Sequence, residues 1–166
     1  MDRESENELE SILAAYRAKV VDAEEREAKR KAARASFIDV FRSLKAERIG
    51  PVLREFAARL NEHGHEASVV DQQDASDRNG RFAPASIALR VVPARIGDAP
   101  VGQSGRTLVE VTFSANQEAM KVVISSSNNG QGTSGRRGQY DVEEVTQDFV
   151  VSNVLKTIRD AFAIGQ

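Results

Sequence analysis

Cysteine and tryptophan are both absent from this chain of 166 residues. The first absence excludes disulfide bonds, thiolate metal ligands and thiol catalysis. The second leaves aliphatic side chains and the seven phenylalanines to build the core. No apolar run approaches the roughly 18 residues that a membrane-spanning helix needs. The acidic N-terminus also lacks the pattern of a secretory signal. We therefore expect a cytoplasmic protein that does not enter a membrane.

Catalytic signatures are lacking as well. The sequence contains no G-x-S-x-G, H-E-x-x-H, S-x-x-K or G-x-x-x-x-G-K-[ST] motif. Its two histidines, His63 and His65, flank a predicted helix end, where the helix dipole alone accounts for them. The aspartates of residues 71–77 do not fit a calcium loop, because Arg78 occupies a ligand position. The sequence assigns no catalytic residue, metal site or cofactor, and it favours a protein that is not an enzyme.

Residues 1–35 have the composition of a charged helical arm. They contain no Gly or Pro, and good helix formers dominate. Ser5 and Glu8 have the spacing of a capping box, which predicts where the helix starts. Acidic residues gather at its beginning and basic residues gather over residues 26–34. One apolar stripe at 4-3-4 spacing, with Ile12 beside it, comprises Leu9, Leu13, Tyr16 and Val20.

The arm has two interpretations. In the first it is a solvated helix held by pairs of opposite charge. These pairs are Asp22–Arg26, Glu25–Lys29 and Glu27–Lys31. In the second it packs against the arm of another copy, antiparallel, with the acidic start of one helix beside the basic end of the other. The apolar repeat is shorter than the three heptads that define a coiled coil, but we expect a homo-oligomer, most simply a dimer.

Residues 36–70 form the predicted junction between the arm and the rest of the chain. A cap at Ser36 predicts that the first helix ends near Ala35, and Gly50-Pro51 predicts a break in the second. Gly64 predicts a left-handed residue that ends the helical region. The expected buried faces are Phe37, Val40, Phe41 and Leu44, followed by Val52, Leu53, Phe56, Ala57 and Leu60. If the faces of Phe37 and Phe56 bury against different cores, the first belongs to a partner chain.

Alternating apolar residues predict four strands after this junction. The strands are Glu66–Gln72, Ser86–Val92, Arg106–Ala115 and Ala119–Ser125. One apolar face and one mixed face are typical of an antiparallel sheet that is covered on one side. Residues 116–118 are too few for a crossover, so the last two strands form a hairpin. Arg90, Glu110 and Lys121 are expected on the outer face. Longer loops are predicted over 74–84, with an Asn79-Gly80 turn, and over 93–105.

The stretch 127–138 is rich in glycine. Gly130, Gly132 and Gly135 match G-x-G-x-x-G, but no helix opens after them, so a dinucleotide site is excluded. The stretch is either a mobile hairpin or loop, or an anion-binding site in which Arg136 and Arg137 supply the charge.

A helix capped by Thr146 and ended by Gly165 is predicted to close the chain on one sheet face. Its apolar residues are Phe149, Val150, Val154, Leu155, Ile158, Ala161 and Phe162. The expected fold is α+β: an arm over 1–35, and a globular domain over 36–166 with a broken helix, a four- to five-stranded antiparallel meander and the closing helix. A short fifth strand is expected near Tyr140.

Three hypotheses for function follow. The first is a small intracellular interaction protein, an adaptor, a chaperone-like protein or a regulator, that self-associates through its N-terminal helices and binds a protein partner. The second is a small-ligand or anion-binding domain that uses the concave sheet face and loop 127–138. The third, nucleic-acid binding through residues 26–34, is disfavoured by the net charge of -2 and by the acidic neighbours of those residues.

Overall fold

The structure, a computed structural model, describes residues 2–94, 107–130 and 132–163. By its internal contacts the chain divides into two units, Met1–Ser36 and Phe37–Gln166. The helices are α1 (Arg3–Leu44), the π-helical turn η1 (Lys45–Ile49), α2 (Gly50–Glu62), the 3-10 turn η2 (Val142–Glu144) and α3 (Gln147–Phe162). None of the helices in the described ranges is long and apolar enough to cross a membrane.

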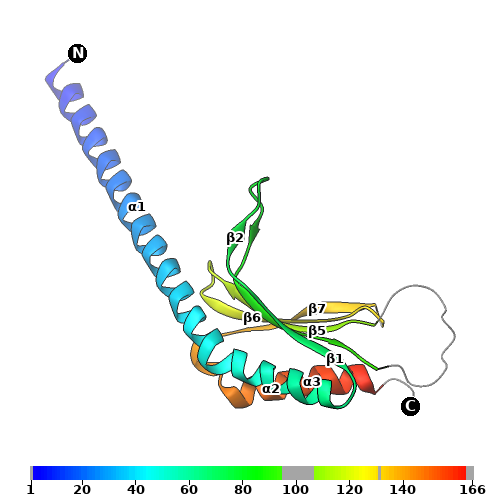
Figure 1. Cartoon of the computed structure of the whole chain (residues 1–166). Helices are drawn as coiled ribbons and strands as arrows, with labels where there is room; N and C mark the ends of the chain where they lie inside the picture. The colour runs from blue at the N-terminus through cyan, green and yellow to red at the C-terminus, as the bar shows by residue number, and fades with distance from the viewer. Residues whose placement is uncertain (1, 95–106, 131, 164–166) are drawn as a thin grey trace. The chain divides into compact units, whose positions relative to one another are not determined.

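A five-stranded antiparallel sheet is the centre of the second unit, and the fold is α+β as the sequence predicts. Its strands lie in the order β1 (Glu66–Gln72), β4 (Ser86–Val92), β5 (Val109–Asn116), β6 (Lys121–Asn128) and β7 (Thr133–Tyr140). Apart from the small hairpin of β2 (Ala75–Ser76) and β3 (Phe82–Ala83), each strand pairs with the next along the chain (Figure 1). The predicted turn in that hairpin is confirmed by Gly80, whose φ is +75°.

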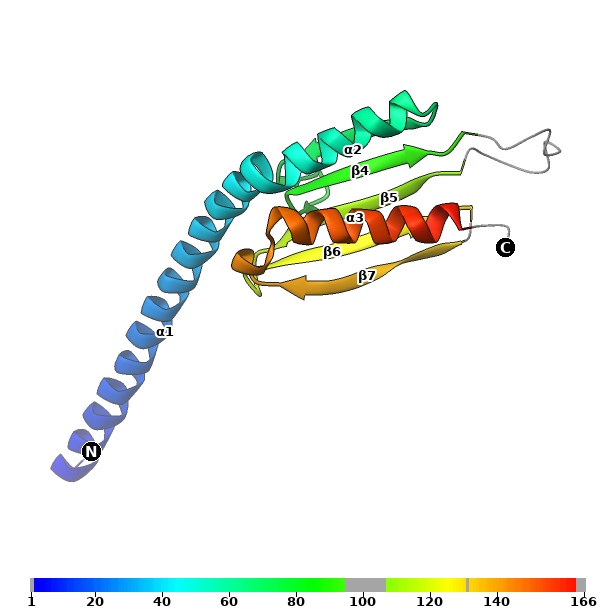
Figure 2. The same ribbon diagram turned by 90° about the horizontal axis from the view of Figure 1, so that it is seen from below.

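The sheet is covered on one face by α2 and α3, which lie side by side and run roughly along the strands (Figure 2). Alternate residues point into this layer because side chains on a strand alternate between its faces. In β4, Ile87, Leu89 and Val91 are at most 2% exposed, and Phe113 in β5 is fully buried. Leu53 of α2 is fully buried in the same cluster. We call the opposite face of the sheet the outer face.

The faces of Phe37 and Phe56 belong to a single core. Phe37 is buried in the main cluster, and Phe56 packs against that cluster from α2. The first face therefore belongs to this chain and not to a partner. Val40 was also expected to be buried, but its side chain is 46% exposed, and that prediction is wrong.

The predicted helix break at Ser36 is wrong, because α1 continues from Arg3 to Leu44. At Gly50-Pro51 the chain does not leave the helical conformation either; it makes the π-helical turn η1. The amide of Gly50 donates to the Lys45 carbonyl, five residues back. This wider turn suits proline, whose ring would otherwise clash with the carbonyl of Glu47 and which has no N–H to donate. The Glu47 carbonyl instead accepts from the side-chain amide of Gln147 at 3.4 Å.

The end of α2 is as predicted. Gly64 has φ +85° and its amide donates to the Asn61 carbonyl, while the amide of His65 donates to the Leu60 carbonyl. These two bonds form a Schellman motif, which satisfies carbonyls that the end of a helix leaves unpaired. β1 then begins at Glu66, the residue predicted from the sequence.

The second half of the sheet differs from one prediction and decides between two others. Met120, expected in a strand, lies in the β5–β6 turn at φ +52°, and β6 begins after it. The glycine-rich stretch 127–138 was predicted as either a hairpin or a loop, and it is a hairpin: it contains the end of β6 and most of β7, which pair antiparallel. A glycine without a side chain can still join such a ladder of backbone hydrogen bonds. Residues 95–106, which include most of the predicted loop 93–105 and the predicted start of the third strand, lie outside the described residues.

Helix α3 closes the sheet face as predicted, and its cap at Thr146 is confirmed. The Thr146 hydroxyl accepts from the amide of Phe149 at 3.2 Å. Leu155 is 44% exposed, however, whereas Thr157 is buried and its hydroxyl donates to the carbonyl of Asn153. The predicted helix end at Gly165 lies outside the described residues.

Candidate functional site

The apolar stripe of the arm is the most extensive exposed apolar feature of the described chain. Every residue from Asp2 to Ala32 is exposed. Within this segment the large apolar side chains are 39–66% exposed. They are Leu9, Ile12, Leu13, Tyr16, Val20 and Val21. Contiguous exposed apolar surface of this kind marks sites of interaction, and we call Leu9, Leu13, Tyr16 and Val20 the arm stripe.

Local interactions account for the start of the arm. The helix begins at Arg3, earlier than the predicted capping box, and Asp2 is its cap. The Ser5 amide donates to Oδ1 of Asp2 at 2.8 Å, and the hydrogen bonds from Ser5 hold the pKa of the Asp2 carboxyl below its ordinary value. Asp22 and Arg26 form the predicted ion pair at 2.8 Å on the exposed surface. Such a pair contributes only a few tenths of a kcal/mol.

Charge is distributed unevenly along the arm. Glu4, Glu6 and Glu8 precede or border the apolar stripe, while Arg30 and Lys31 follow it, and all five are exposed. Exposed charged side chains of this kind remain hydrated and bear no desolvation cost. The exposed arm therefore presents an apolar segment between an acidic end and a basic end.

Arg136 and Arg137, the predicted anion-binding residues, do not form one cluster. Both lie in β7, where the register with β6 shifts between Ile124 and Ser125, so Arg137 is the extra residue of a β-bulge. Arg136 is opposite Ser125 on the outer face and is exposed. Arg137 turns to α3, where its guanidinium donates to the Asn153 carbonyl at 3.2 Å. Bulges commonly re-aim a side chain in this way.

The outer face around Arg136 is rich in hydroxyl groups. Ser125 and Ser127 of β6, and Ser134 of β7, lie on this face by their register. Arg90 and Glu110, predicted to share it, are opposite each other and form an ion pair. Lys121, the third charged residue expected there, pairs instead with Asp141 at 2.7 Å. This hydrogen bond raises the pKa of the Lys121 ammonium above its ordinary value.

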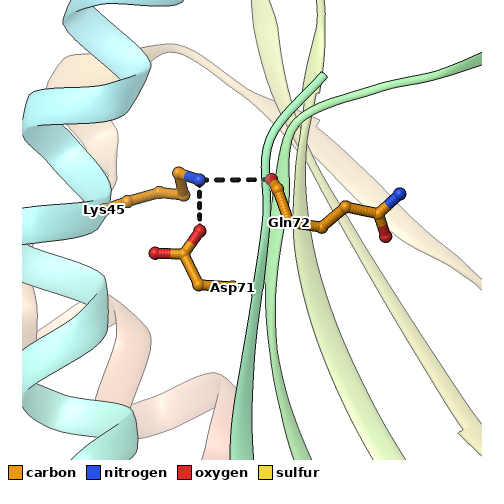
Figure 3. Close-up of polar contacts among 3 residues, drawn as sticks. All are labelled: Lys45, Asp71 and Gln72. Atoms are coloured by element: carbon orange, nitrogen blue, oxygen red, sulfur yellow. Dashed lines mark hydrogen bonds and ion pairs between the residues drawn. The ribbon is translucent and has the colours of Figure 1, made fainter. Parts of the chain in front are cut away.

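A buried lysine that was not predicted from the sequence lies in η1. Lys45 is only 3% exposed, and its Nζ donates to Oδ1 of Asp71 at 2.5 Å and to the Gln72 carbonyl at 3.3 Å (Figure 3). The ammonium is also 5.8 Å from the centre of the Phe41 ring. A buried charge needs such partners, because removal from water is costly.

The arrangement around Lys45 joins η1 to the edge strand β1. Asp71 is 53% exposed, so the pair lies at the boundary of the core. A signal was present in the sequence: Lys45 follows Phe41 by four residues and precedes Ile49 by four, which places it on the apolar face of a helix. We interpret the pair as a structural link, since the buried ammonium already donates hydrogen bonds to Asp71 and Gln72 of the same chain.

The two histidines are explained by packing and capping. Nδ1 of His65 accepts from the amide of Ala94 at 2.9 Å, and its ring lies 5.0 Å from that of Phe162. His63 is the C-cap of α2 and is exposed. Within residues 2–94, 107–130 and 132–163, no group of three or more His, Cys, Asp or Glu side chains could hold a metal ion.

The geometry thus defines a class of protein by its fold: an α+β domain with an antiparallel sheet, two covering helices and an exposed helical arm. Comparisons with protein-family models, with curated proteins and with solved structures found no match to this chain.

Proposed function

We propose that this chain is a small, non-catalytic interaction protein that associates with a second copy of itself through the arm and presents its α+β unit to a protein partner. The observation that carries the proposal is the arm stripe, with Leu13 44% and Tyr16 66% exposed on a helix whose surrounding residues are all exposed. The cytoplasmic location expected from the sequence stays a prediction.

The physical reason to expect self-association of the arm is the way in which helices are stabilised. An isolated helix is marginal in water, and in proteins the burial of an apolar face supplies most of its stability. The second unit meets this requirement within itself: Phe41, Leu53 and Val154 are fully buried against the sheet. The arm has an apolar face of comparable length, and burial of each large aliphatic side chain on it is worth about 1.5–3 kcal/mol. A second arm offers a matching face.

The experiment measures the molar mass of the full chain by size-exclusion chromatography with light scattering, over a range of concentrations. The wild type is expected to be dimeric at micromolar concentration. A chain with Leu13→Glu and Val20→Glu is expected to be monomeric, because each charge would be buried in the interface.

The chain offers a close control. Val21 is next to Val20 and is also an exposed valine, at 53%, but it lies outside the stripe. Val21→Glu should leave the dimer intact. A wild type that is monomeric at every concentration would refute the proposal, and so would equal effects of glutamate at positions 20 and 21.

The second candidate, an anion or small-ligand site, is favoured by one specific observation. Arg136 is exposed on the outer face opposite Ser125, and Ser134 lies on the same face. Arginine with neighbouring hydroxyls is suited to phosphate. Inorganic phosphate should then raise the melting temperature of the wild type but not of Arg136→Ala. Arg137→Ala is the control, because Arg137 is held by α3; its phosphate-induced shift should persist.

A further inference from the structure

Building on the proposed self-association, we propose that the two arms pair antiparallel, centred between Leu13 and Tyr16, with Glu10 of each copy beside Arg17 of the other. The partner is a second copy of this chain, and apolar overlap and charge select the same alignment. The inference depends on the order of residues along the exposed arm, in which residues 2–32 are all exposed.

The arm stripe has the spacing of a coiled-coil seam, and this spacing determines which residues meet across a pair. The apolar members of the seam, at 4-3-4-3 spacing, are Leu9, Leu13, Tyr16, Val20 and Ala23. The next members in the same phase are charged: Glu27, Arg30 and Arg34. The residues that flank the seam on one side are Arg3, Glu10, Arg17, Glu24 and Lys31. The seam is thus apolar in its first part and charged in its second.

A parallel pair would place every seam residue against its own copy. Glu27 would face Glu27, and Arg30 and Arg34 would each face an identical arginine. Like charges in direct opposition are destabilising and steer against such an arrangement. The charged part of the seam therefore disfavours a parallel pair.

An antiparallel pair follows a different rule of contact. In heptad notation Leu13 and Val20 occupy a positions, and Leu9 and Tyr16 occupy d positions. In an antiparallel pair each a residue meets a d residue of the other helix. Flanking residues on the same side of each helix meet one another. These rules allow a series of registers, and four of them overlap the apolar part of the seam.

The register centred between Leu9 and Leu13 is unfavourable, because it would set Glu10 opposite Glu10 of the second copy and Tyr16 against Glu6. Three registers remain.

The first register is centred between Leu13 and Tyr16. Leu13 then meets Tyr16 of the second copy, and Leu9 meets Val20. Each contact occurs twice, because the two-fold axis of the pair repeats it. All four large side chains of the seam are therefore buried against apolar partners, and the apolar overlap is as complete as the sequence allows.

The flanking charges are also complementary in the first register. Glu10 lies opposite Arg17 of the second copy, and Arg3 lies opposite Glu24. On the other side of the seam Ile12 lies opposite Lys19, whose methylene groups can cover it while the ammonium stays in water. No like charges meet beside the seam.

The second register is centred between Tyr16 and Val20 and is unfavourable by charge. It would place Glu10 opposite Glu24, and Arg17 opposite Arg17 of the second copy. It would also set the apolar Leu9 against the charged Glu27. Repulsion beside the seam and a shorter apolar overlap both disfavour this alignment.

The third register is centred between Val20 and Ala23. Its flanking charges are complementary, since Glu10 would lie opposite Lys31 and Arg17 opposite Glu24. The seam, however, would bring Leu13 against Arg30 and leave the leucine without an apolar partner. The lost burial outweighs such exposed ion pairs, which contribute only a few tenths of a kcal/mol each.

The first register refines the antiparallel arrangement expected from the sequence. The acidic start of one arm lies beside residues 17–27 of the other, and the basic residues Arg30 and Arg34 extend beyond the overlap. The charge preference for this register therefore comes from single charged residues next to the seam, and the acidic and basic ends of the arm do not pair with each other as a whole.

The test exchanges one pair of charges. Glu10→Lys alone and Arg17→Glu alone should each weaken the dimer on the order of tenfold in Kd, since two symmetric contacts change from attraction to repulsion. The double variant should regain the wild-type Kd within about threefold, because opposite charges again face each other at both contacts. In a parallel pair, positions 10 and 17 are about 10 Å apart along the axis, and no rescue would occur.

The single variants also separate the antiparallel registers. In the second register Glu10→Lys would replace a repulsive contact with an attractive one and would tighten the dimer. In the third register the rescue of Glu10→Lys would come from Lys31→Glu and not from Arg17→Glu. Either result would overturn the first register.

The matched control exchanges charges that point away from the seam. Glu8 and Lys29 have the same pair of signs as Glu10 and Arg17. Glu8→Lys and Lys29→Glu, singly and together, should leave Kd within about twofold of the wild type. Equal effects of both sets of exchanges would show a general charge effect and overturn the inference.

Cross-linking provides an independent measurement, and the natural chain contributes no cysteine to confuse it. In the proposed register Glu6 meets Ala23 of the second copy in the seam. A mixture of Glu6→Cys chains and Ala23→Cys chains carrying different tags should form the mixed disulfide. Neither variant alone should cross-link, because each pair of identical positions would lie about 25 Å apart along the axis.

The outcomes separate this inference from the function on which it rests. Absence of double-variant rescue, or cross-linking of Ala23→Cys with itself, would overturn the antiparallel register while light scattering still showed a dimer. A wild type that is monomeric at all concentrations would overturn both the self-association and the register.

Discussion

The first half and the last turns of helix α1 contain similar side chains in opposite environments. Tyr16 is 66% exposed, whereas Phe41 is fully buried, and both lie on an apolar face repeated at helical spacing. In the second unit that face meets a sheet formed by residues far along the chain. The difference shows that periodicity creates an apolar face, while burial depends on what the rest of the molecule brings to it. Five predictions test how far the arm and the α+β unit differ.

The largest change in the free energy of unfolding is expected from truncating the buried Phe41 side chain. Phe41→Ala should lower the free energy of unfolding of the second unit by about 3–5 kcal/mol, because it removes a large buried side chain and leaves a cavity. Tyr16→Ala should change it by less than about 0.5 kcal/mol. Urea denaturation followed by circular dichroism measures both. Similar losses at the two positions would mean that the arm stripe is part of the same folded core.

Gly50 tests whether the π-helical turn tolerates a side chain. A Cβ at this position would lie 2.6 Å from the Lys45 carbonyl oxygen, which is backbone and cannot move away easily. Gly50→Ala should therefore cost about 1–3 kcal/mol of unfolding free energy, although alanine is the better helix former. Gly135→Ala is the control, since nothing lies within 4 Å of its Cβ. A more stable Gly50→Ala chain would contradict the geometry of η1.

Two ion pairs compare the core boundary with the arm. Asp71→Ala should cost about 1–2 kcal/mol, because it leaves the ammonium of buried Lys45 with only the Gln72 carbonyl. The double variant Asp71→Ala/Lys45→Met should recover most of this loss. Asp22→Ala, which breaks the exposed pair with Arg26 in the arm, should cost less than about 0.5 kcal/mol. Thermal denaturation of these variants and the wild type measures the contrast.

Glycine substitutions should change stability in opposite directions in the two units. Met120 has φ +52°, a left-handed conformation that costs a side chain about 1 kcal/mol. Met120→Gly should stabilise the α+β unit by about 0.5–1 kcal/mol. In the arm, Ala18→Gly should weaken helix formation by about 1 kcal/mol. Denaturation measures the first and helical circular dichroism the second; a loss of stability in Met120→Gly would be the contrary result.

The smallest expected effects are the pH dependences of stability at one residue in each unit, and these also run in opposite directions. Asp2 has a lowered pKa through the Ser5 hydrogen bonds, so its contribution to the arm is present above the unfolded pKa and is lost as pH falls through the folded pKa. Lys121 has a raised pKa through its hydrogen bond to Asp141. Its contribution is present below the unfolded pKa and is lost as pH rises through the folded pKa. NMR titration should show both shifts, and Asp141→Asn should abolish that of Lys121.

Short-range patterns in the sequence predicted a large part of the fold. The bounds of β1 and β4 are those predicted, and so are the left-handed cap at Gly64 and the N-cap at Thr146. These features depend on alternation, on glycine's freedom at positive φ, and on a hydroxyl near a free amide. Each is settled by residues within a few positions of one another.

Errors and open alternatives occurred where distant residues decided the outcome. Ser36 was expected to end a helix, but the buried face of Phe37 and Phe41 continues the helix through it into the core. Gly135 and Gly138 left a hairpin and a loop as alternatives, and pairing with β6 decides for the hairpin. Arg136 and Arg137 were expected to act together, and a bulge in that pairing sends them apart. Tertiary hydrogen bonds and packing overrode local propensity in each case.

The sequence by itself determined the periodicities: a charged helix with an apolar stripe, a sheet with one apolar face, and the caps that begin and end its helices. Those follow from backbone geometry and from side-chain chemistry over one or two turns. Only the tertiary structure decided that Lys45 is buried against Asp71, and that the Phe41 face is covered while Tyr16 is exposed. Burial requires a second surface, and the residues that supply it here lie in strands and helices far along the chain.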